Sequence, residues 1–461
     1  MIKRNIISER LNLTSLIKIL FYTFPISFII GNFALSLNLF LFIVLGLVLV
    51  FKDKLNYRFN NLYWLLIFFF LYVFLLTLFQ FKDLEFLYKT VPNWSVDSHP
   101  MLKSFIIVRY LILVFVIDIL FYNKILKLEK FFFISLICTS FVSLDIILQY
   151  LTGSDIFGFK SVLRWNSGPF GTEMIAGSYL QKFSFLSIFY FFQFIKLKNF
   201  NSPFLIFFIV LHLLAMLLAG NKMPMLLFLF GCSIIVIFIK RLRFITISSL
   251  IIFISIFVLI FKNDPNVNHS YSSFFKHINF LDKAKVVSEI SVVKETDEKK
   301  SKYTQWGAYN NKVYTFLIGS GHQRLFRASF AMWEEKPLWG FGLKSFRVKC
   351  WEILPQIDGL ACSTHPHNYY LELLSETGLV GTITILIFFI ILLIKSLDFL
   401  SKKNYKTKSE KYLIIPMLII FILEIWPLKS SGSFFTTGIA TFIWLLIGMI
   451  FATTQKNTLI K

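Results

Sequence analysis

Residues 62–80 read LYWLLIFFFLYVFLLTLFQ and contain no charged side chain. Because a helix needs about 20 mainly apolar residues to cross a bilayer, this run predicts a transmembrane helix. Similar runs recur along the chain and predict about twelve spans in all. Their ranges are 15–33, 35–51, 62–80, 102–122, 131–151, 172–195, 203–219, 223–239, 244–261, 377–395, 412–428 and 434–452. The first two runs almost touch, so they also fit one kinked or re-entrant unit. The expected fold class is an all-α polytopic membrane protein.

The overall composition supports this fold class. Of the 461 residues, 56% are hydrophobic and 58 are Phe, and the mean hydropathy is +0.70. A soluble domain has about 45–50% apolar residues even with glycine counted, so the excess is expected to face lipid. The formal net charge of +22 fits a membrane protein whose Lys and Arg collect at cytoplasmic helix ends. Nucleic acid is not an expected partner, because no basic stripe is interleaved with exposed aromatics in the polar segments.

The distribution of Lys and Arg predicts the orientation in the membrane. Basic side chains are dense at 3–18, 52–58, 124–130, 196–198, 240–243, 395–411 and 456–461, and sparse in the short loops between these segments. By the positive-inside rule the dense segments are cytoplasmic. We therefore expect a multi-pass protein of a bacterial inner membrane with both termini in the cytoplasm. The first apolar run lacks a small-residue cleavage site behind it and is expected to be a retained helix.

This orientation divides the chain into three parts. Residues 1–261 hold the first nine predicted spans, residues 262–376 form one large periplasmic loop domain with short helices, and residues 377–461 hold the last three spans. Residues 282–302 mix acids and bases with few aromatics and are predicted to be a mobile insertion. Residues 312–376 combine several Trp with many basic side chains. They are expected to fold, to attract anions, and to contain the catalytic part.

A dense polar cluster lies at residues 363–378, which read STHPHNYYLELLSETG. Pro366 disfavours helix before it and suits a helix start after it, so a short amphipathic helix is predicted to follow. Asn368, Glu372 and Glu376 would share its polar face. His367 would lie at the helix N-terminus, where the dipole keeps the imidazole neutral and N–H groups can bind an anion. A neutral imidazole can act as a general base. A histidine that merely packs against Tyr and Leu at the interface fits the pattern equally well.

Arg324 and Arg327 lie one turn apart on a stretch that is predicted to be a helix ending at Pro337. Residues at this spacing share a face, and the guanidinium fork matches a pair of pyrophosphate oxygens. A solvated basic face is the alternative interpretation.

Three motifs resemble the O-antigen ligase and O-antigen polymerase family of bacterial envelope glycosyltransferases. His367-Asn368, then nine residues, then Gly378-Leu-Val-Gly381-Thr382 fits the ligase signature without a gap. The segment from Arg327 through Pro337-Leu-Trp-Gly-Phe-Gly342 is similar to the stretch ahead of that histidine. Residues 219–224, AGNKMP, resemble a Ser-Arg segment of the family, with Lys222 where Arg is usual. Lysine keeps the charge and loses the bidentate fork.

The resemblance implies a specific chemistry. Members of the family transfer a glycan from an undecaprenyl-pyrophosphate carrier to an acceptor hydroxyl at the periplasmic face. The acceptor is the lipid A–core for a ligase and another carrier-linked repeat unit for a polymerase. His367 would be the general base, while Arg327, with Arg164 or Lys222 contributing, would hold the pyrophosphate. Ligases of this family are thought to need no metal and no cofactor. The outside loop agrees, since it has no Asp-x-Asp pair and its alternate His365 and His367 are weak evidence for a metal site.

Charged residues within the apolar runs are costly and default to functional or paired roles. Glu173 and Lys182, with Arg164 nearby, are candidates to line a pocket for the carrier head. Asn368 and Glu376 complete the set of candidate substrate-binding residues. Asp118 and Asp145 are expected to be structural and to pair with Arg109 or Lys182.

Cys350 and Cys362 both lie on the predicted outside loop, and the periplasm is oxidising enough to keep disulfides. A bond between them is therefore predicted, and it would tie the Arg- and Trp-rich stretch to the segment of His367. Two independent thiols are the alternative. Cys138 and Cys232 lie in apolar runs and are expected to be buried and free.

Other functions stay open at this point. A secondary transporter also has about twelve spans, although such proteins usually show repeated halves and broken helices, which are not visible here. A sugar-bound scaffold or sensor without turnover is a third interpretation. The sequence does not decide between ligase and polymerase, and it does not identify the sugar, the acceptor or the oligomeric state.

Overall fold

The computed structural model describes residues 13–57, 59–90, 100–162, 165–195, 201–278, 322–357, 362–401 and 408–455. Within these ranges the chain is helical and contains no named strand, only two isolated bridges, Ser154 with Lys160 and Val162 with Trp165. The predicted all-α class is confirmed. The predicted insertion at 282–302 lies outside the described residues.

Each predicted apolar range coincides with part of a described helix. The helices are α2 (Phe24–Ile30), α3 (Asn32–Lys52), α4 (Leu62–Thr90), α5 (Pro100–Ile106), α6 (Arg109–Tyr122), α7 (Leu128–Thr152), α8 (Ala176–Phe194), α9 (Asn201–Leu218), α10 (Lys222–Phe238), α11 (Lys240–Asn263), α12 (Pro265–Ile278), α15 (Gln323–Glu335), α16 (Phe346–Ile357), α17 (Tyr369–Ser401), α18 (Lys408–Glu424) and α19 (Thr437–Gln455). A short 3₁₀ turn, η2, covers Gly168–Phe170.

Seven helices in the described part of the chain are long and apolar enough to cross a membrane. A bent pair, Leu13–Tyr22 and Phe24–Ile30, makes eight if it counts as one span. Its halves meet at 56°, and Pro25 lies at the start of the second half, where a proline is tolerated. The bend lies inside the first apolar run and not between the first two runs, where the sequence suggested a kinked unit, since Asn32–Lys52 is a long apolar helix of its own. The count of twelve spans stays a prediction.

The bundle core is built from the same aromatic and aliphatic residues that make the sequence so apolar. Trp444 of α19 is 1% exposed, and its ring lies 5.0 Å from that of Phe70 on α4 and 6.5 Å from that of Phe388 on α17. Phe68 and Phe79 point outward from α4 and are 49% and 73% exposed. Such an outward apolar face is expected where a helix meets lipid tails. The bundle therefore buries one set of Phe residues and presents another.

The short helix predicted after Pro366 lies at the start of α17, which continues beyond it across a kink at Gly378, the one residue inside α17 with non-helical dihedral angles. At this kink the backbone N–H groups of Leu379 and Val380 donate to the Pro337 and Leu338 carbonyls and not to carbonyls of their own helix. The pairing predicted for two buried aspartates is wrong. Asp118 does not depend on Arg109 or Lys182, since it accepts a hydrogen bond of 2.9 Å from the Tyr63 hydroxyl. Asp145 likewise accepts one of 2.9 Å from the backbone N–H of Ile156.

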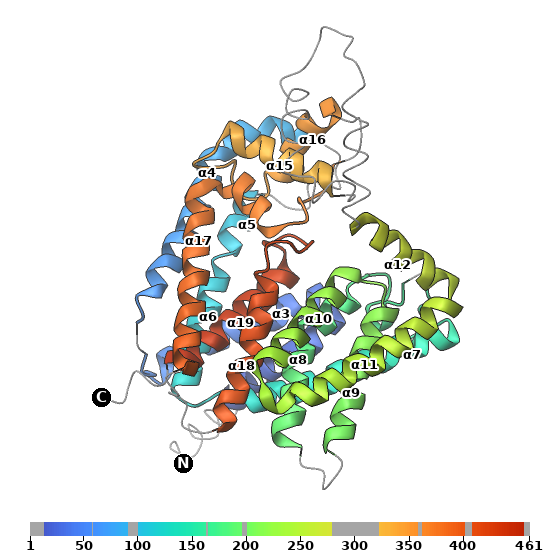
Figure 1. Ribbon diagram of the computed structural model, residues 1–461. Coiled ribbons are helices and arrows are strands. Elements are labelled where there is room, and N and C mark those ends of the chain that lie inside the picture. The colour runs from blue at the N-terminus through green and yellow to red at the C-terminus, as the bar shows by residue number, and fades with distance from the viewer. Residues whose placement is uncertain are drawn as a thin grey trace, which may run out of the picture.

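Helices α15 and α16 lie at one end of the bundle, above the ends of α4, α5 and α17 (Figure 1). We call residues 322–357 and 362–368 the cap. The cap has a small hydrophobic core separate from that of the bundle, made of Leu325, Ala328, Ala331, Met332, Phe341, Phe346, Cys350 and Cys362. Cys350 and Cys362 form a disulfide with Cα atoms 6.0 Å apart, as the sequence predicts, and Cys138 and Cys232 are buried and free.

Candidate functional site

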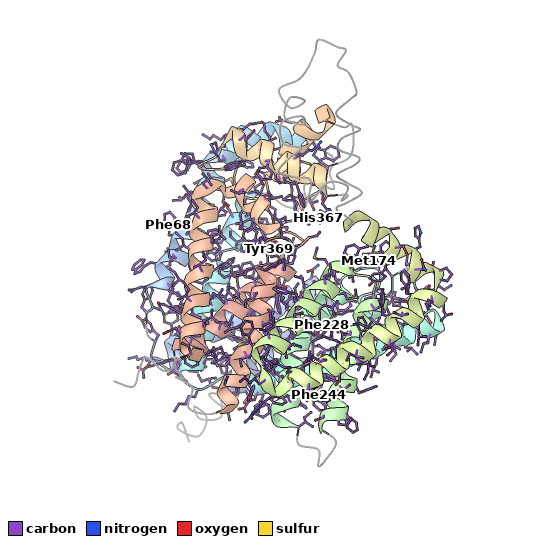
Figure 2. All side chains as sticks on the ribbon, viewed as in Figure 1. Phe68, Met174, Phe228, Phe244, His367 and Tyr369 are labelled. Atoms are coloured by element: carbon purple, nitrogen blue, oxygen red, sulfur yellow. A yellow bond between two sulfur atoms is a disulfide. The ribbon has the colours of Figure 1, made fainter. Side chains whose placement is uncertain are left out.

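His367 lies where the cap meets the helix bundle (Figure 2). It is two residues before α17, and its φ of 59° places it in the left-handed region, which is uncommon for a residue other than glycine. Asn368 holds the junction in place. Its Oδ1 accepts hydrogen bonds from the backbone N–H groups of Tyr370 at 3.0 Å and Leu371 at 3.2 Å, as an N-cap residue does. Backbone strain of the kind shown by the positive φ of His367 is found at functional sites more often than elsewhere.

Three histidine rings pack together at this junction. The ring centroid of His367 lies 4.1 Å from that of His365 and 4.3 Å from that of His322. His322 comes from the cap, at the residue before α15, while the other two flank Pro366. Nδ1 of His365 contacts the Thr364 hydroxyl at 3.1 Å, and its buried Nε2 has no hydrogen-bond partner in the described structure.

The surroundings favour the neutral form of these rings. Burial lowers the pKa of His367 to about 4, with a further lowering by His322 and a smaller opposing effect of the Ser431 backbone. Burial lowers the pKa of His365 to about 3, and repulsion by His367, Lys344 and Arg347 adds to this. Burial alone lowers the pKa of His322. At neutral pH the three imidazoles are therefore uncharged and can accept protons.

A buried ionic network joins the cap to α17 beside the histidines. Lys344 is 4% exposed and Glu372 is 1% exposed, and their charged groups are 4.0 Å apart. The Lys344 ammonium also donates to the Ser433 hydroxyl at 2.8 Å, and that hydroxyl donates to Glu372. Glu376 accepts hydrogen bonds from the backbone N–H groups of Lys344 at 2.8 Å and Phe346 at 3.3 Å, so it caps the start of α16. Burial lowers the pKa of Lys344 even though both carboxylates oppose the shift.

The segment between α18 and α19 forms another wall of the site. The backbone N–H of Ser431 donates to the His367 carbonyl at 2.9 Å, and that of Phe434 donates to Glu372 at 2.6 Å. The Asn368 side-chain amide donates to the Pro427 carbonyl at 2.8 Å and to the Lys429 carbonyl at 3.3 Å. The loop before α17 is thus fixed from two sides.

The two glycine-containing motifs meet at the kink of α17. The N–H of Leu379 donates to the Pro337 carbonyl at 2.9 Å, and that of Gly342 donates to the Glu376 carbonyl at 2.8 Å. A Cβ on Gly378 would lie 2.3 Å from the Leu338 carbonyl oxygen, and its φ of 61° also favours glycine. A tyrosine of α4, Tyr72, donates across this joint to the Thr377 carbonyl at 2.8 Å and is 3.0 Å from that of Trp339. The joint explains why these glycines are spaced as they are.

With this geometry in place, the chain can be compared with known proteins. Residues 207–386 match the O-antigen ligase family. The resemblance read from the three motifs is therefore confirmed for this segment, which runs from α9 through the cap into α17. No curated protein matches the chain.

Residues 207–386 are thus similar to O-antigen ligases, and the long apolar helices indicate a membrane protein. The matched segment includes the left-handed His367, the joint at Gly378 and Lys222. It ends before α18 and α19, so the wall that contains Ser431 and Ser433 is supplied by a part of the chain outside the match.

The predicted site residues of this O-antigen ligase-like chain fall into separate groups. His367, Asn368 and Glu376 lie at the junction of cap and bundle, and the polar groups of Asn368 and Glu376 cap helices. The disulfide lies in the core of the cap. Arg327 is half-buried on α15, and no described residue forms an ion pair with it. Arg324 lies on the same helix, but its side chain is outside the described residues, as is all of Arg164.

The other predicted residues lie on or near α8 and α10. Glu173 is exposed in the turn before α8, and Lys222 begins α10 with its ammonium 5.6 Å from the Phe274 ring centroid. Asn221 joins these two segments, because it accepts from Gly177 at 3.2 Å and donates to Met174 at 3.0 Å. Lys182 is within coulombic range of Glu424, a buried carboxylate that pairs with Lys429 at 2.7 Å.

Sequence reasoning missed Lys344, Arg347 and His322. Lys344 and Arg347 are 4% and 6% exposed, and burial of a basic side chain is the signal that marks them. Their positions in the sequence, just after Gly342, do not predict that their side chains are buried. His322 is separated from His367 by the whole cap, so only the fold brings the two rings together.

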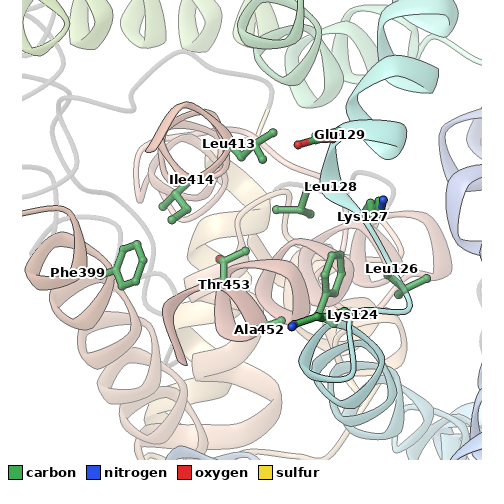
Figure 3. A pocket seen from close by; sticks show the side chains of 11 residues that line it. Lys124, Leu126, Lys127, Leu128, Glu129, Phe399, Leu413, Ile414, Ala452 and Thr453 are labelled. Carbon is green, nitrogen blue, oxygen red and sulfur yellow. The ribbon is translucent and has the colours of Figure 1, made fainter. Parts of the chain in front are cut away.

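Two further observations concern the surroundings of the site. In the described part of the chain, no group of three or more His, Cys, Asp and Glu is arranged to hold a metal ion. A cavity of about 340 Å³ lies at the other end of α17, near Phe399, and is shown in Figure 3. It is lined mainly by apolar side chains together with Lys124, Lys127 and Glu129. It is not part of the site around His367.

Proposed function

We propose that this chain transfers a glycan from an undecaprenyl-pyrophosphate carrier to a hydroxyl of lipid A–core at the periplasmic face. One observation carries the proposal: the histidine of the family signature lies at the junction of cap and bundle, uncharged, in ring contact with His365, on which the buried Lys344 and Arg347 act. The transferred group would be attacked by the acceptor oxygen, and the pyrophosphate would leave. As the resemblance implies, the reaction needs neither metal nor cofactor.

His367 is the proposed general base. Its backbone is bonded to Ser431 and its neighbour Asn368 is fixed on both sides, so the ring has a defined position. A neutral imidazole can take the proton of the acceptor hydroxyl as the new glycosidic bond forms. With a pKa of about 4 the ring is a weak base in the empty site. A bound anion nearby would raise that pKa and strengthen the base.

The pyrophosphate is proposed to bind at the cationic side of the cap. Arg327 offers a guanidinium fork without an ion-pair partner among the described residues. Lys344 and Arg347 add two buried cations close enough to lower the pKa of His365. Buried cations interact with an anion more strongly than exposed ones, because water screens them less. Seven other residues stay candidates for contacts along the carrier head and the glycan: Arg324, Arg164, Lys222, Asn368, Glu376, Glu173 and Lys182.

The polyprenyl chain needs an apolar surface that reaches the site from the lipid. An open cavity of about 340 Å³ lies along α4 beside Trp339, and its lining is almost wholly apolar. Its members are Phe68, Leu71, Tyr72, Leu75, Leu76, Phe79, Gln80 and Trp339. It touches the joint at Gly378 through Tyr72. We propose that it accommodates the first isoprene units of the carrier.

The membrane arrangement belongs to the same proposal. We place the chain in a bacterial inner membrane with both termini cytoplasmic and residues 262–376 periplasmic, on the strength of the Lys and Arg asymmetry. Carrier-linked glycans and the lipid A–core would then both be available on the side of the cap. Accessibility of a cysteine introduced in the cap to a membrane-impermeant reagent in whole cells tests this placement.

The decisive test is transfer by the purified chain in lipid nanodiscs. Carrier-linked glycan is offered with lipid A–core in one reaction and with carrier-linked repeat units in another. Product on lipid A–core supports the ligase. Product only on the repeat units would make the chain a polymerase, a reaction that uses the same donor and the same site. No product with either acceptor, from a chain that still binds the carrier, would contradict both.

A further inference from the structure

The cluster of His322, His365 and His367 contains one member that the proposed reaction does not use. His322 is contributed by the N-terminal end of α15 and packs its ring 4.3 Å from that of the proposed base, with the ring planes tilted by 34°. The two rings belong to different elements of the cap. Their contact is therefore a product of the fold and not of local sequence.

Charged groups lie near the cluster on several elements. Lys344, in the segment before α16, and Arg347, in α16, act on His365, and Arg327 lies on the helix that follows His322. On α17 the carboxylates of Glu372 and Glu376 face Lys344, and they accept hydrogen bonds from backbone groups of Phe434 and Phe346. Lys103 of α5 adds another positive charge near Lys344. A pyrophosphate bound among these groups would change the charge that each imidazole experiences.

A simple Coulomb estimate gives the size of that change. One negative charge about 5 Å away, at an effective dielectric constant of about 20, raises an imidazole pKa by about 2. A pyrophosphate diester carries two such charges. His322 is the ring that adjoins α15, the helix of the proposed pyrophosphate ligand Arg327, whereas Lys344 and Arg347 repel a proton on His365. A charge on one ring then disfavours a second charge on the next.

We propose that binding of the pyrophosphate-linked donor moves one proton from solvent onto His322, and that this charge keeps His367 neutral. An N–H bond forms at the unprotonated ring nitrogen of His322, with the proton supplied by solvent, and no other covalent bond in the protein changes. The cation formed pairs with the bound anion, while its repulsion preserves the neighbouring imidazole as a proton acceptor. The inference deepens the proposed function, on which it rests for the class of ligand.

Proton uptake can be measured without any turnover. The full chain in nanodiscs is titrated, at pH 6.5 and with no acceptor, with a short-chain polyprenyl-pyrophosphoryl sugar whose phosphates do not titrate near neutrality. Calorimetry in two buffers of different ionisation enthalpy gives the number of protons taken up. We expect about one proton to be taken up per ligand bound. As the pH falls from 7.5 to 5.5, the affinity for the ligand should rise by up to about tenfold for each pH unit.

Variants locate the proton. His322→Asn is expected to reduce uptake to near zero and to weaken binding about tenfold, since one favourable charge is lost. His322→Gln is a second variant in case the first does not fold. His269→Asn, in an exposed position of α12, should keep the wild-type uptake. Zero uptake by the wild-type chain, or wild-type uptake by a folded His322 variant, overturns the inference. Transfer that depends on His367 can hold in either case, so failure of the inference and failure of the proposed function are distinguishable.

Discussion

The helix bundle and the cap are stabilised in different ways. The bundle buries a large, continuous set of aliphatic and aromatic side chains, so no single contact is decisive. The cap has a core of eight residues, two of which form its disulfide, and it is joined to the bundle by a buried ion pair and backbone hydrogen bonds. The stability of a small extramembrane unit therefore depends on a few specific bonds, whereas the stability of the bundle depends on the large apolar surface area that it buries. Single substitutions should therefore have larger effects in the cap.

The largest expected effect is on chemistry. His367→Asn removes the proposed base and keeps a residue that tolerates the left-handed backbone. We expect transfer by the purified chain to fall about 10²–10⁴-fold, the usual contribution of a general base. Membrane insertion and thermal stability should change little. His269→Asn is the matched control. Wild-type transfer by His367→Asn would end the assignment of the base and leave the histidine with a packing role.

A second prediction concerns the joint between cap and bundle. Gly378→Ala places a Cβ 2.3 Å from the Leu338 carbonyl oxygen at a positive φ. Because that oxygen belongs to backbone and cannot rotate away, we expect a loss of about 3–4 kcal/mol in stability. Thermal unfolding and proteolysis of the cap measure it. Gly438→Ala in α19 is the control, since its added Cβ would meet only Asn32 Oδ1 at 3.8 Å. Equal stability of the two variants would show that the joint is not tightly packed.

Removal of the disulfide should have a smaller effect that is confined to the cap. Closing a loop with a sequence separation of 12 is worth about 3 kcal/mol or less in the chain-entropy model. The double variant Cys350→Ser, Cys362→Ser is expected to speed hydrogen exchange in α15 and α16 and to leave exchange in α6 and α19 unchanged. Cys138→Ser, in α7 of the bundle, serves as the control. Faster exchange throughout the bundle would contradict the view that the cap opens as a separate unit.

Sequence reasoning succeeded where the signal is local or repetitive. Apolar runs of membrane length predicted helix positions across the bundle, and the spacing of His367, Gly378 and Gly381 indicated the family. Sequence reasoning failed where a contact joins segments that are far apart along the chain. Asp118 was expected to pair with a cation, but Tyr63 on α4 supplies its partner. His322 and Lys344 carried no local signal, because their importance arises from burial beside His367 and Glu372.

The smallest expected effect tests where the bundle contributes to binding. Trp339 is 54% exposed beside the apolar cavity on α4, and Tyr72 donates a hydrogen bond to its backbone carbonyl, with the two ring centroids 6.5 Å apart. Trp339→Ala therefore keeps the joint and removes apolar area from the proposed path of the carrier tail. We expect the KM for a long-chain donor to rise about fivefold with kcat unchanged, as for loss of uniform binding. The KM for a donor with a very short chain should not change, since that chain does not reach the cavity. Trp64→Ala, at the other end of α4, is the control, because Trp64 is similarly exposed at 63%. A rise in KM that is equal for both donors would place the effect of Trp339 at the pyrophosphate and not along the tail.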